Sequence, residues 1–116
     1  MTRVPMTQEQ AIELLRQWSS QKRTVYFSIG FERKFMLTFF EGKFEPDEAD
    51  ARVFRYSQAG MVVVISPYHF EQCERAETDD MECVIFSDGL GTNGAIGYCP
   101  KGNKPVPVEQ FSKWLN

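Results

Sequence analysis

The 116-residue sequence contains only three cysteines and one histidine, and these numbers limit the chemistry that it can perform. Cys73, Cys83 and Cys99 are odd in number and widely spaced, which is untypical of a disulfide framework and fits a reducing compartment. No two of them have the C-x-x-C spacing that is common in structural zinc sites. We therefore expect a cytoplasmic protein with reduced thiols, no bound metal and no cofactor.

The chain also has no excess of positive charge and no long apolar segment. Its formal net charge is −3, and residues 59–116 carry four Lys or Arg against eight Asp or Glu. The longest uninterrupted apolar run, Met61 to Ile65, is far shorter than the roughly 20 residues of a membrane-spanning helix. No basic region followed by an apolar stretch opens the chain. These features predict a soluble protein that binds neither nucleic acid nor membrane.

Aromatic residues are plentiful, because the chain has ten Phe, four Tyr and two Trp, which make up 14% of it. A chain of this length fits one domain and can bury roughly two thirds of its unfolded surface. We therefore predict a single α+β domain over residues 1–116, with large rings in its core.

The first predicted element is a helix that begins after Thr7. The "TQEQ" segment fits a capping box between Thr7 and Gln10, and an apolar stripe at helical spacing follows. The stripe consists of Ala11, Leu14, Leu15 and Trp18. A second amphipathic helix is predicted at the C-terminus, where Pro107 suits a first helical turn. Its apolar residues are Val108, Phe111, Trp114 and Leu115.

Between the two helices, alternating and β-branched segments predict an antiparallel sheet of five or six strands built from hairpins. The segment 61–66 is continuously apolar at its start and reads as a central strand buried on both faces. Residues 67–80 read as a loop with some helix. The candidate strands are Val25–Gly30, Lys34–Glu41, Ala51–Ser57, Met61–Ser66, Glu82–Ser87 and Ala95–Cys99.

The stretch "SDGLGTNGAIGY" places Gly89, Gly91 and Gly94 on the G-x-G-x-x-G spacing of a dinucleotide-binding loop. Such a loop must lead into a helix whose N-terminal amides meet the pyrophosphate. Gly97 and Pro100 prevent a helix here. We interpret the stretch as a hairpin, with a tight turn at Asn93-Gly94.

Other chemical groups are present without a recognised spacing. His69, Cys73, Cys83 and Cys99 would suit tetrahedral zinc, or Cys73 could be a nucleophile with His69 as its base, but reduced, buried thiols are the favoured interpretation of the cysteines. The sequence does not decide whether these four residues converge. The acidic residues in turn-rich stretches read as solvated loops rather than catalytic or calcium sites. They are Glu41, Glu45, Asp47, Asp79, Asp80 and Asp88.

The remaining signal is a sheet face that is part polar and part aromatic. The basic and aromatic mixture of "ARVFRYS" and "RKFM" resembles a base-stacking sheet in chemistry only, because the net charge is negative. One interpretation is a second core, and another is an exposed patch. The candidate partner-binding face comprises Tyr26, Met36, Phe40, Arg52, Phe54 and Tyr56.

On this basis the sequence predicts a small intracellular binding or regulatory module that acts through a protein partner or a homodimer. No catalytic residues are assigned, so an enzyme is the less favoured interpretation. The alternative is a small-molecule-binding protein or enzyme with a pocket on the sheet, where Asp88, Asn93 and Tyr98 would supply the polar groups.

Overall fold

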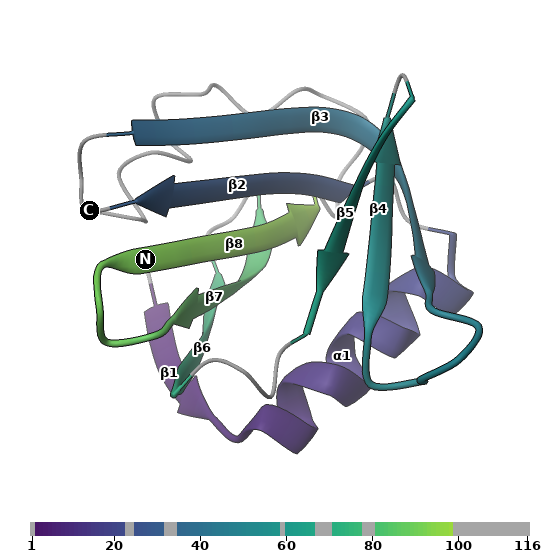
Figure 1. Ribbon diagram of the computed structural model, residues 1–116. Helices are drawn as coiled ribbons and strands as arrows, with labels where there is room; N and C mark the ends of the chain where they lie inside the picture. Colours follow the sequence, from purple (N-terminus) through teal and green to yellow (C-terminus); the bar gives the residue numbers. More distant parts are fainter. Residues whose placement is uncertain are drawn as a thin grey trace.

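A computed structural model describes residues 2–22, 25–31, 35–58, 60–66, 71–77 and 81–98, and the side chains of all of these except 35–41. Within these residues the chain forms eight strands and one helix (Figure 1). In chain order they are β1 (Thr2–Met6), α1 (Gln8–Ser20), β2 (Val25–Phe31), β3 (Phe35–Pro46), β4 (Phe54–Gln58), β5 (Met61–Ile65), β6 (Gln72–Glu77), β7 (Glu82–Ser87) and β8 (Thr92–Tyr98).

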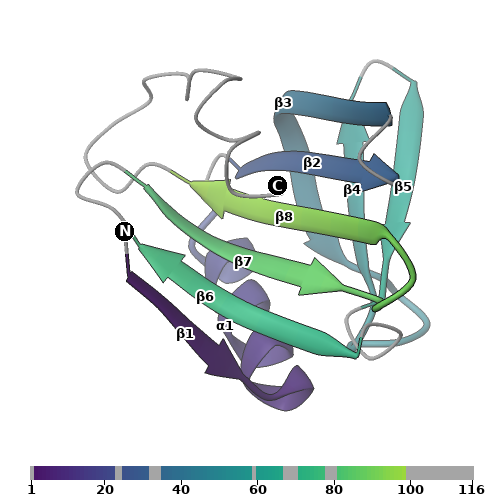
Figure 2. The same cartoon turned by 90° about the vertical axis from the view of Figure 1, so that its left-hand side faces the viewer.

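All eight strands belong to one antiparallel sheet with the order β1-β6-β7-β8-β2-β3-β4-β5. Two runs of consecutive strands, β2 to β5 and β6 to β8, meet where β8 pairs with β2. Figure 2 shows β2, β8, β7 and β6 side by side, with α1 behind them and β4 and β5 at one end of the layer. Among the described strands, β1 and β5 are therefore the two edges of the sheet.

The sheet bends sharply because β3 changes partner along its length. Its first part pairs with β2, and its last four residues, Lys43 to Pro46, pair with β4. Gly42 lies at the change, and the Tyr56 ring occupies the space where a side chain on Gly42 would be. The Gly42 N–H donates to Tyr56 Oη over 2.8 Å. The missing side chain lets β4 fold back over β3 and turns the β4–β5 hairpin across the other strands (Figure 1).

Helix α1 packs on the inner face of this bent sheet. The predicted capping box is confirmed, because Gln10 N–H donates to Thr7 Oγ1 and Thr7 N–H donates to Gln10 Oε1. Ala11, Leu15 and Trp18 are buried, and the Trp18 ring meets the Tyr98 ring edge-on with centroids 4.8 Å apart. The strand residues of this core are Val25, Phe27, Phe44, Phe54, Tyr56, Ile65, Cys73, Val84, Phe86, Ile96 and Tyr98.

The predicted α+β fold is wrong in its balance, because the described chain is mostly sheet. It has eight strands instead of five or six, and one helix. The predicted C-terminal helix over 107–115 lies outside the described residues. The N-terminal strand β1 escaped prediction because Thr2–Met6 is short and contains a proline, a residue that disfavours a central strand.

The prediction for residues 67–80, a loop with some helix, is also wrong, because part of this segment forms strand β6. Gln72–Glu77 is a strand between β1 and β7. Its only apolar positions are Cys73 and Ala76, and its charges gave no alternating pattern. Ion pairs with neighbouring strands hold it: Arg75 contacts Glu82, and Arg3 contacts Glu74 over 2.8 Å. Charged residues can form a strand when each charge meets a partner across the ladder.

The central strands are buried on both faces. On the face away from α1, Tyr26, Ser28, Cys83 and Ala95 are each no more than 1% exposed. Phe27 packs under α1, whereas Tyr26 and Ser28 are buried on the opposite face, as the second-core interpretation expects and the exposed patch does not. No helix of the described residues is long and apolar enough to cross a membrane.

Candidate functional site

Strand β5 is an apolar edge of the sheet. The sequence predicted a central strand there, and this is wrong, because β4 is the only described strand with which β5 pairs. Met61, Val62 and Val64 are 44%, 48% and 61% exposed. An edge strand presents a row of unpaired backbone N–H and C=O groups. Proteins usually protect such an edge with charges, proline or a bulge, and "MVVVI" supplies none of these.

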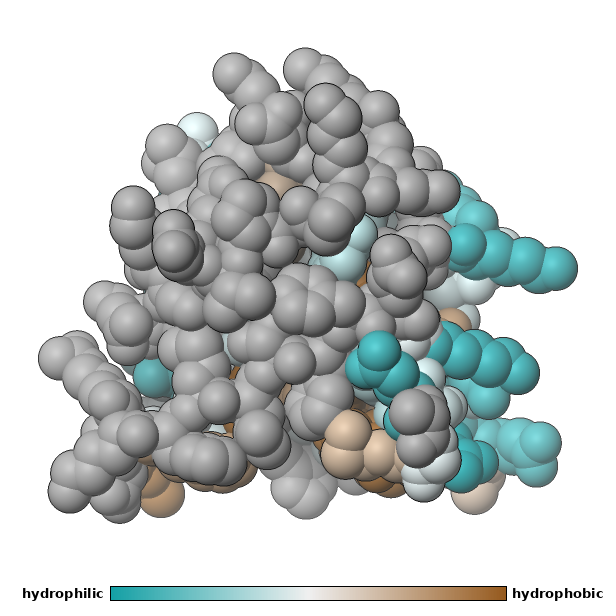
Figure 3. All heavy atoms as spheres, turned by 90° about the horizontal axis from the view of Figure 1, so that it is seen from above, coloured by the Kyte–Doolittle hydropathy of each residue, from teal (hydrophilic) through white to brown (hydrophobic). Residues whose placement is uncertain are grey.

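The outer face of the β3–β4–β5 region becomes less polar towards this edge. The antiparallel register aligns each of the two outward-facing β5 valines with one residue of β4 and one of β3. The view from above shows hydrophobic and hydrophilic side chains next to one another on the side where Figure 1 places β4 and β5 (Figure 3). The two rows are Lys43–Ser57–Val62 and Glu45–Arg55–Val64.

The opposite edge, β1, is protected by its sequence. Pro5 has no backbone N–H to offer to another strand, and Arg3 adds a charge that forms an ion pair with Glu74. Val4 between them is 53% exposed, close to the value for Val64. The two edges therefore differ in protection rather than in exposure, which makes β1 a natural control for β5.

An apolar cleft lies on the inner side of β5. Its volume is about 220 Å³, and it separates the end of β5 from β2, β7 and β8. The Ser66 hydroxyl faces a buried environment and has no hydrogen-bond partner among the described residues. A buried hydroxyl without a partner is costly and is available to a polar group that enters the cleft. The lining residues are Phe27, Ile29, Val63, Val64, Ile65, Ser66, Phe86 and Gly94.

A second cleft, of about 410 Å³, lies between β1 and α1. Arg75 forms one wall, where its guanidinium contacts Glu77 over 2.9 Å and also Glu82. Glu13 of α1 adds another carboxylate to the lining. Since two carboxylates already share the guanidinium, the cleft offers little attraction to an anionic ligand.

Glu82 is a buried carboxylate with both oxygens engaged. Tyr98 Oη donates to Glu82 Oε2 over 2.9 Å, and Arg75 Nη2 donates to Oε1. Tyr98 in turn packs against Trp18. The network ties β6, β7 and β8 together beneath α1, and we interpret it as structural because its acceptor atoms are already bonded.

The predicted partner-binding residues do not form one surface. Tyr26, Phe54 and Tyr56 are no more than 1% exposed, so their rings lie in the interior. Arg52 is exposed, whereas the side chains of Met36 and Phe40 lie outside what the structure describes. The alternation of Phe54 and Tyr56 with polar residues does mark a one-sided strand, but its apolar side faces α1.

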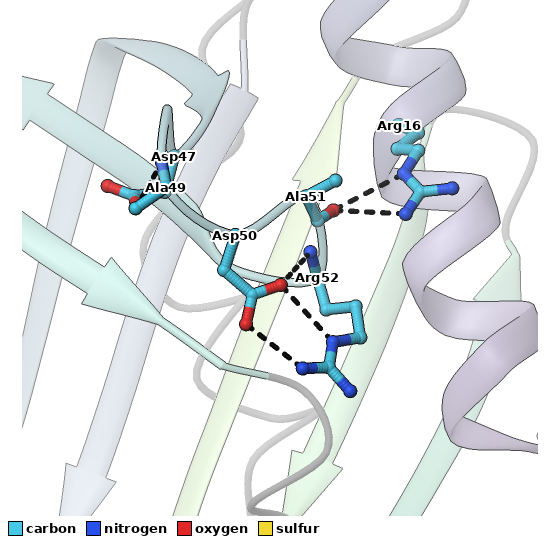
Figure 4. A network of polar contacts seen from close by, with 6 residues as sticks. All are labelled: Arg16, Asp47, Ala49, Asp50, Ala51 and Arg52. Carbon is cyan, nitrogen blue, oxygen red and sulfur yellow. Dashed lines mark hydrogen bonds and ion pairs between the residues drawn. The ribbon is translucent and has the colours of Figure 1, made fainter.

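Arg52 belongs to the β3–β4 loop, which is fastened by its own polar groups (Figure 4). Its guanidinium and backbone N–H both donate to the Asp50 carboxylate. The Arg52 side-chain hydrogen bond is the main cause of a lowered pKa of Asp50. The Arg16 guanidinium reaches the loop from α1 and donates to the Ala51 carbonyl over 3.2 and 3.3 Å. Arg52 is thus occupied within its own loop.

Cys73 and Cys83 lie on opposite faces of the sheet. Cys73 pairs with Phe86 and shares the α1 side, whereas Cys83 lies three positions before Phe86 and points to the other side. The two cannot hold one metal ion, and no metal-binding group of three exists among the described side chains. His69 and Cys99 lie outside the described residues.

The burial of Cys73 and Cys83 also disfavours their thiolate forms. Burial raises the pKa of Cys73 to about 11, and burial likewise raises the pKa of Cys83. Both thiols are therefore protonated at neutral pH, and the Cys73 nucleophile has no thiolate to use. Cys83 lies opposite Gly97.

The glycine-rich stretch is a hairpin between β7 and β8, as predicted, because the two strands pair antiparallel without a following helix. The position of the turn is a correction. Asn93 pairs with Ser87 inside the ladder, and the connection is Asp88 to Gly91. Gly89 and Gly91 have φ values of 73° and 106°, which L side chains rarely adopt.

Asp88 organises this connection. Its Oδ1 accepts the N–H groups of Leu90 and Thr92 over 2.7 and 3.0 Å, and Tyr98 lies at the far end of β8. Asp88, Asn93 and Tyr98 therefore do not form the polar group expected of a pocket on the sheet.

The residues of β5 were missed as a site because a continuous apolar run has the same pattern at an edge as in the middle of a sheet.

Asp88 gives a pH-dependent prediction. The hydrogen bond from Leu90 is the main cause that lowers the pKa of Asp88 below its ordinary 3.8. Its stabilising effect is therefore complete above pH 3.8 and is lost as the pH falls through the lower folded-state pKa. Asp88→Asn keeps the acceptor oxygen without the charge, so we expect a shallower acid loss of stability than in the wild type. Asp88→Ala should lower stability at neutral pH.

Urea unfolding at a series of pH values measures both effects. Equal acid profiles for the wild type and Asp88→Asn would contradict the assignment of Asp88 as a contributor.

Comparison with known proteins finds no relative: no protein-family model, curated protein or solved structure matches the chain. The function must therefore be argued from the geometry of the chain itself.

Proposed function

We propose that the protein is a small intracellular binding module whose contact surface is the free edge of β5. A partner polypeptide would add to this edge as a further antiparallel strand. The observation that supports this function best is the unprotected, uncharged edge, in which Met61, Val62 and Val64 are nearly half exposed or more. The cytoplasmic location predicted from the cysteine content is part of this proposal, and the described cysteines are free thiols.

The backbone geometry of the hairpin indicates which groups would bind. β4 ends at Gln58 and β5 begins at Met61, so the residues that flank the turn form a hydrogen-bonded pair. Such pairs alternate along an antiparallel ladder. Val63 therefore bonds to β4, whereas Val62 and Val64 direct their N–H and C=O groups away from the sheet. An added strand would satisfy these groups, as in peptide recognition by strand addition.

The cleft beside β5 would provide selectivity. In strand addition the backbone gives affinity, and pockets for alternate side chains give specificity. Small-molecule pockets usually measure about 300–1,000 Å³. At about 220 Å³, the cleft is better matched to one apolar side chain of an added strand than to a whole ligand. Ser66 Oγ, which lacks a described partner, could bond to a polar atom that enters with it.

Selection from a displayed library of random linear peptides tests this function. Wild-type protein should enrich extended sequences with apolar residues at alternate positions. Val64→Lys places a charge on the edge, and we expect it to lose these peptides. Val4→Lys makes the same change on the β1 edge at similar exposure, and we expect it to bind as the wild type does.

The outcome that contradicts the proposal is no enrichment, or enriched peptides that bind Val64→Lys as well as wild type. The second candidate function is the binding of a small molecule, because the cleft between β1 and α1 has a volume within the range of ligand-binding pockets. A metabolite in that cleft would stabilise wild type and Val64→Lys alike in a thermal-shift screen, which distinguishes it from a partner at β5.

A further inference from the structure

We propose that the strand added at β5 is β5 of a second copy of this chain, paired antiparallel about Val63. The inference rests on the proposed function, since it names the occupant of the same edge. Strand β5 carries three exposed apolar side chains and borders an apolar cleft. A second copy on this edge would explain both features. The resulting dimer would have twofold symmetry, which is the commonest form of assembly among soluble oligomers.

The β5 strand complements itself. Antiparallel pairing centred on Val63 places Val63 opposite Val63 of the second copy, Met61 opposite Ile65, and Val62 opposite Val64. No residue of the strand is charged, so no like charges face each other. Cross-strand pairs of β-branched residues are favourable contributors to a sheet. The outward N–H and C=O groups of Val62 and Val64 would find each other across the axis.

Each face of the paired strands would bury apolar surface. On the outer face, Val62 and Val64 of both copies would form one four-valine cluster. On the inner face, Met61 of the second copy would lie opposite Ile65, which lines the apolar cleft. Methionine is unbranched and flexible, so it fills irregular gaps well. The 44% exposure of Met61 in the single chain is then explained by its place in the dimer.

The charges near the edge do not oppose this pairing. The nearest cation on the outer face is Arg55 of β4, which is in register with Val64. Three strand spacings would separate the two Arg55 residues of a dimer, roughly 14 Å. This exceeds the Debye length of about 8 Å at physiological ionic strength. With a net charge of −3 on each chain, added salt should strengthen the association or leave it unchanged.

Sedimentation velocity of the full chain tests the assembly. From low micromolar to several hundred micromolar protein, the wild-type mass should rise from 13.4 kDa towards twice that value. Val64→Lys should stay monomeric over the same range, and Val4→Lys should dimerise like wild type. Circular dichroism confirms that each variant is folded. A wild type that stays monomeric at the highest concentration, or two variants that dimerise equally, would overturn the inference.

Oxidative cross-linking tests the register. Val63 bonds to β4, so it would form a non-hydrogen-bonded pair with its counterpart, with Cα atoms about 4.5 Å apart. That distance lies within the range for a disulfide. Val63→Cys should therefore give a covalent dimer on oxidation, while wild type and Val64→Cys should not, because Val64 lies opposite Val62. Cross-linking of Val64→Cys in preference to Val63→Cys would show a different register and overturn the pairing about Val63.

The two proposals fail in different ways. If the protein stays monomeric but selects peptides that Val64→Lys does not bind, β5 binds another polypeptide and the second copy is excluded. If it neither dimerises nor selects peptides, the proposed function fails as well. If both occur, an enriched peptide should shift the sedimenting species back to 13.4 kDa, because peptide and second copy compete for one edge.

Discussion

Replacement of Trp18 by alanine is expected to lower the free energy of unfolding by about 3–5 kcal/mol. The side chain is 2% exposed and lies between α1 and the sheet, with its ring edge-on to Tyr98. Removal of the ring would leave a cavity and would also end the aromatic contact. Since domains of this size are stable by only about 5–15 kcal/mol, the variant should be close to unfolding. Urea unfolding followed by far-ultraviolet circular dichroism measures the loss.

Trp18→Phe is the matched control, because it keeps an aromatic ring facing Tyr98 and removes less volume. Its loss should be clearly smaller than that of Trp18→Ala. If Trp18→Ala lost less than about 1 kcal/mol, the site would collapse more easily than its burial indicates, and the packing of α1 on the sheet would need revision.

The second large effect is expected at Gly97 of β8. A Cβ on Gly97 would lie 2.8 Å from Cys83 Cβ and 2.9 Å from the Glu82 carbonyl oxygen, which is closer than real Cβ atoms come. Neither neighbour is the end of a flexible side chain, so β7 and β8 would have to separate. We expect Gly97→Ala to cost about 1–3 kcal/mol, the usual range for overpacking.

Gly94 on the same strand is a close control. It is also buried, but the nearest atom to its added Cβ is the Ser28 carbonyl oxygen at 3.5 Å, an ordinary contact. Gly94→Ala should be neutral, or stabilising by about 0.4–1 kcal/mol through the unfolded state. Melting temperatures of the two variants measure the contrast. Equal losses would show that the loss of glycine, rather than the contact with Cys83 and Glu82, sets the effect.

The substitutions at Trp18 and Gly97 would also affect the proposed binding edge, because β5 packs against the same core. Ile65 of β5 belongs to the same core as Trp18, and the cleft beside β5 is lined by Phe86 of β7 and by Gly94 of β8. Variants that loosen this core should unfold at lower urea concentrations, and this loss of stability distinguishes them from Val64→Lys. At concentrations where the wild type is monomeric, Val64→Lys changes only an exposed side chain and should unfold like wild type.

Local features of the fold were predictable from the sequence. The capping box at Thr7 and Gln10 lies within four residues, and the strand Glu82–Ser87 has the predicted bounds. The hairpins between β4 and β5 and between β7 and β8 also follow from segments next to each other in the chain. Such features depend on backbone propensity, side-chain period and turn chemistry, all of which adjacent residues express.

The candidate site could not be predicted, because it depends on which strands are neighbours. The pattern of "MVVVI" predicts a buried strand, and only the strand order reveals that no described strand pairs with its second side. Tyr26, Phe54 and Tyr56 were placed on a partner-binding face because alternation identifies the two sides of a strand but not what covers each side. Phe54 and Tyr56 face α1, whereas Tyr26 is buried on the face away from α1.

The sequence by itself determined the helix start, most of the strands, the hairpin reading of the glycine-rich stretch and the poor spacing for a metal or nucleotide site. The tertiary structure alone decided that β6 joins β1 to β7, that β3 bends at Gly42, and that β5 ends the sheet. The physical reason is the range of the interactions. Capping, alternation and turns act between residues a few positions apart, whereas burial and edge exposure follow from the packing of distant segments, which no local pattern encodes.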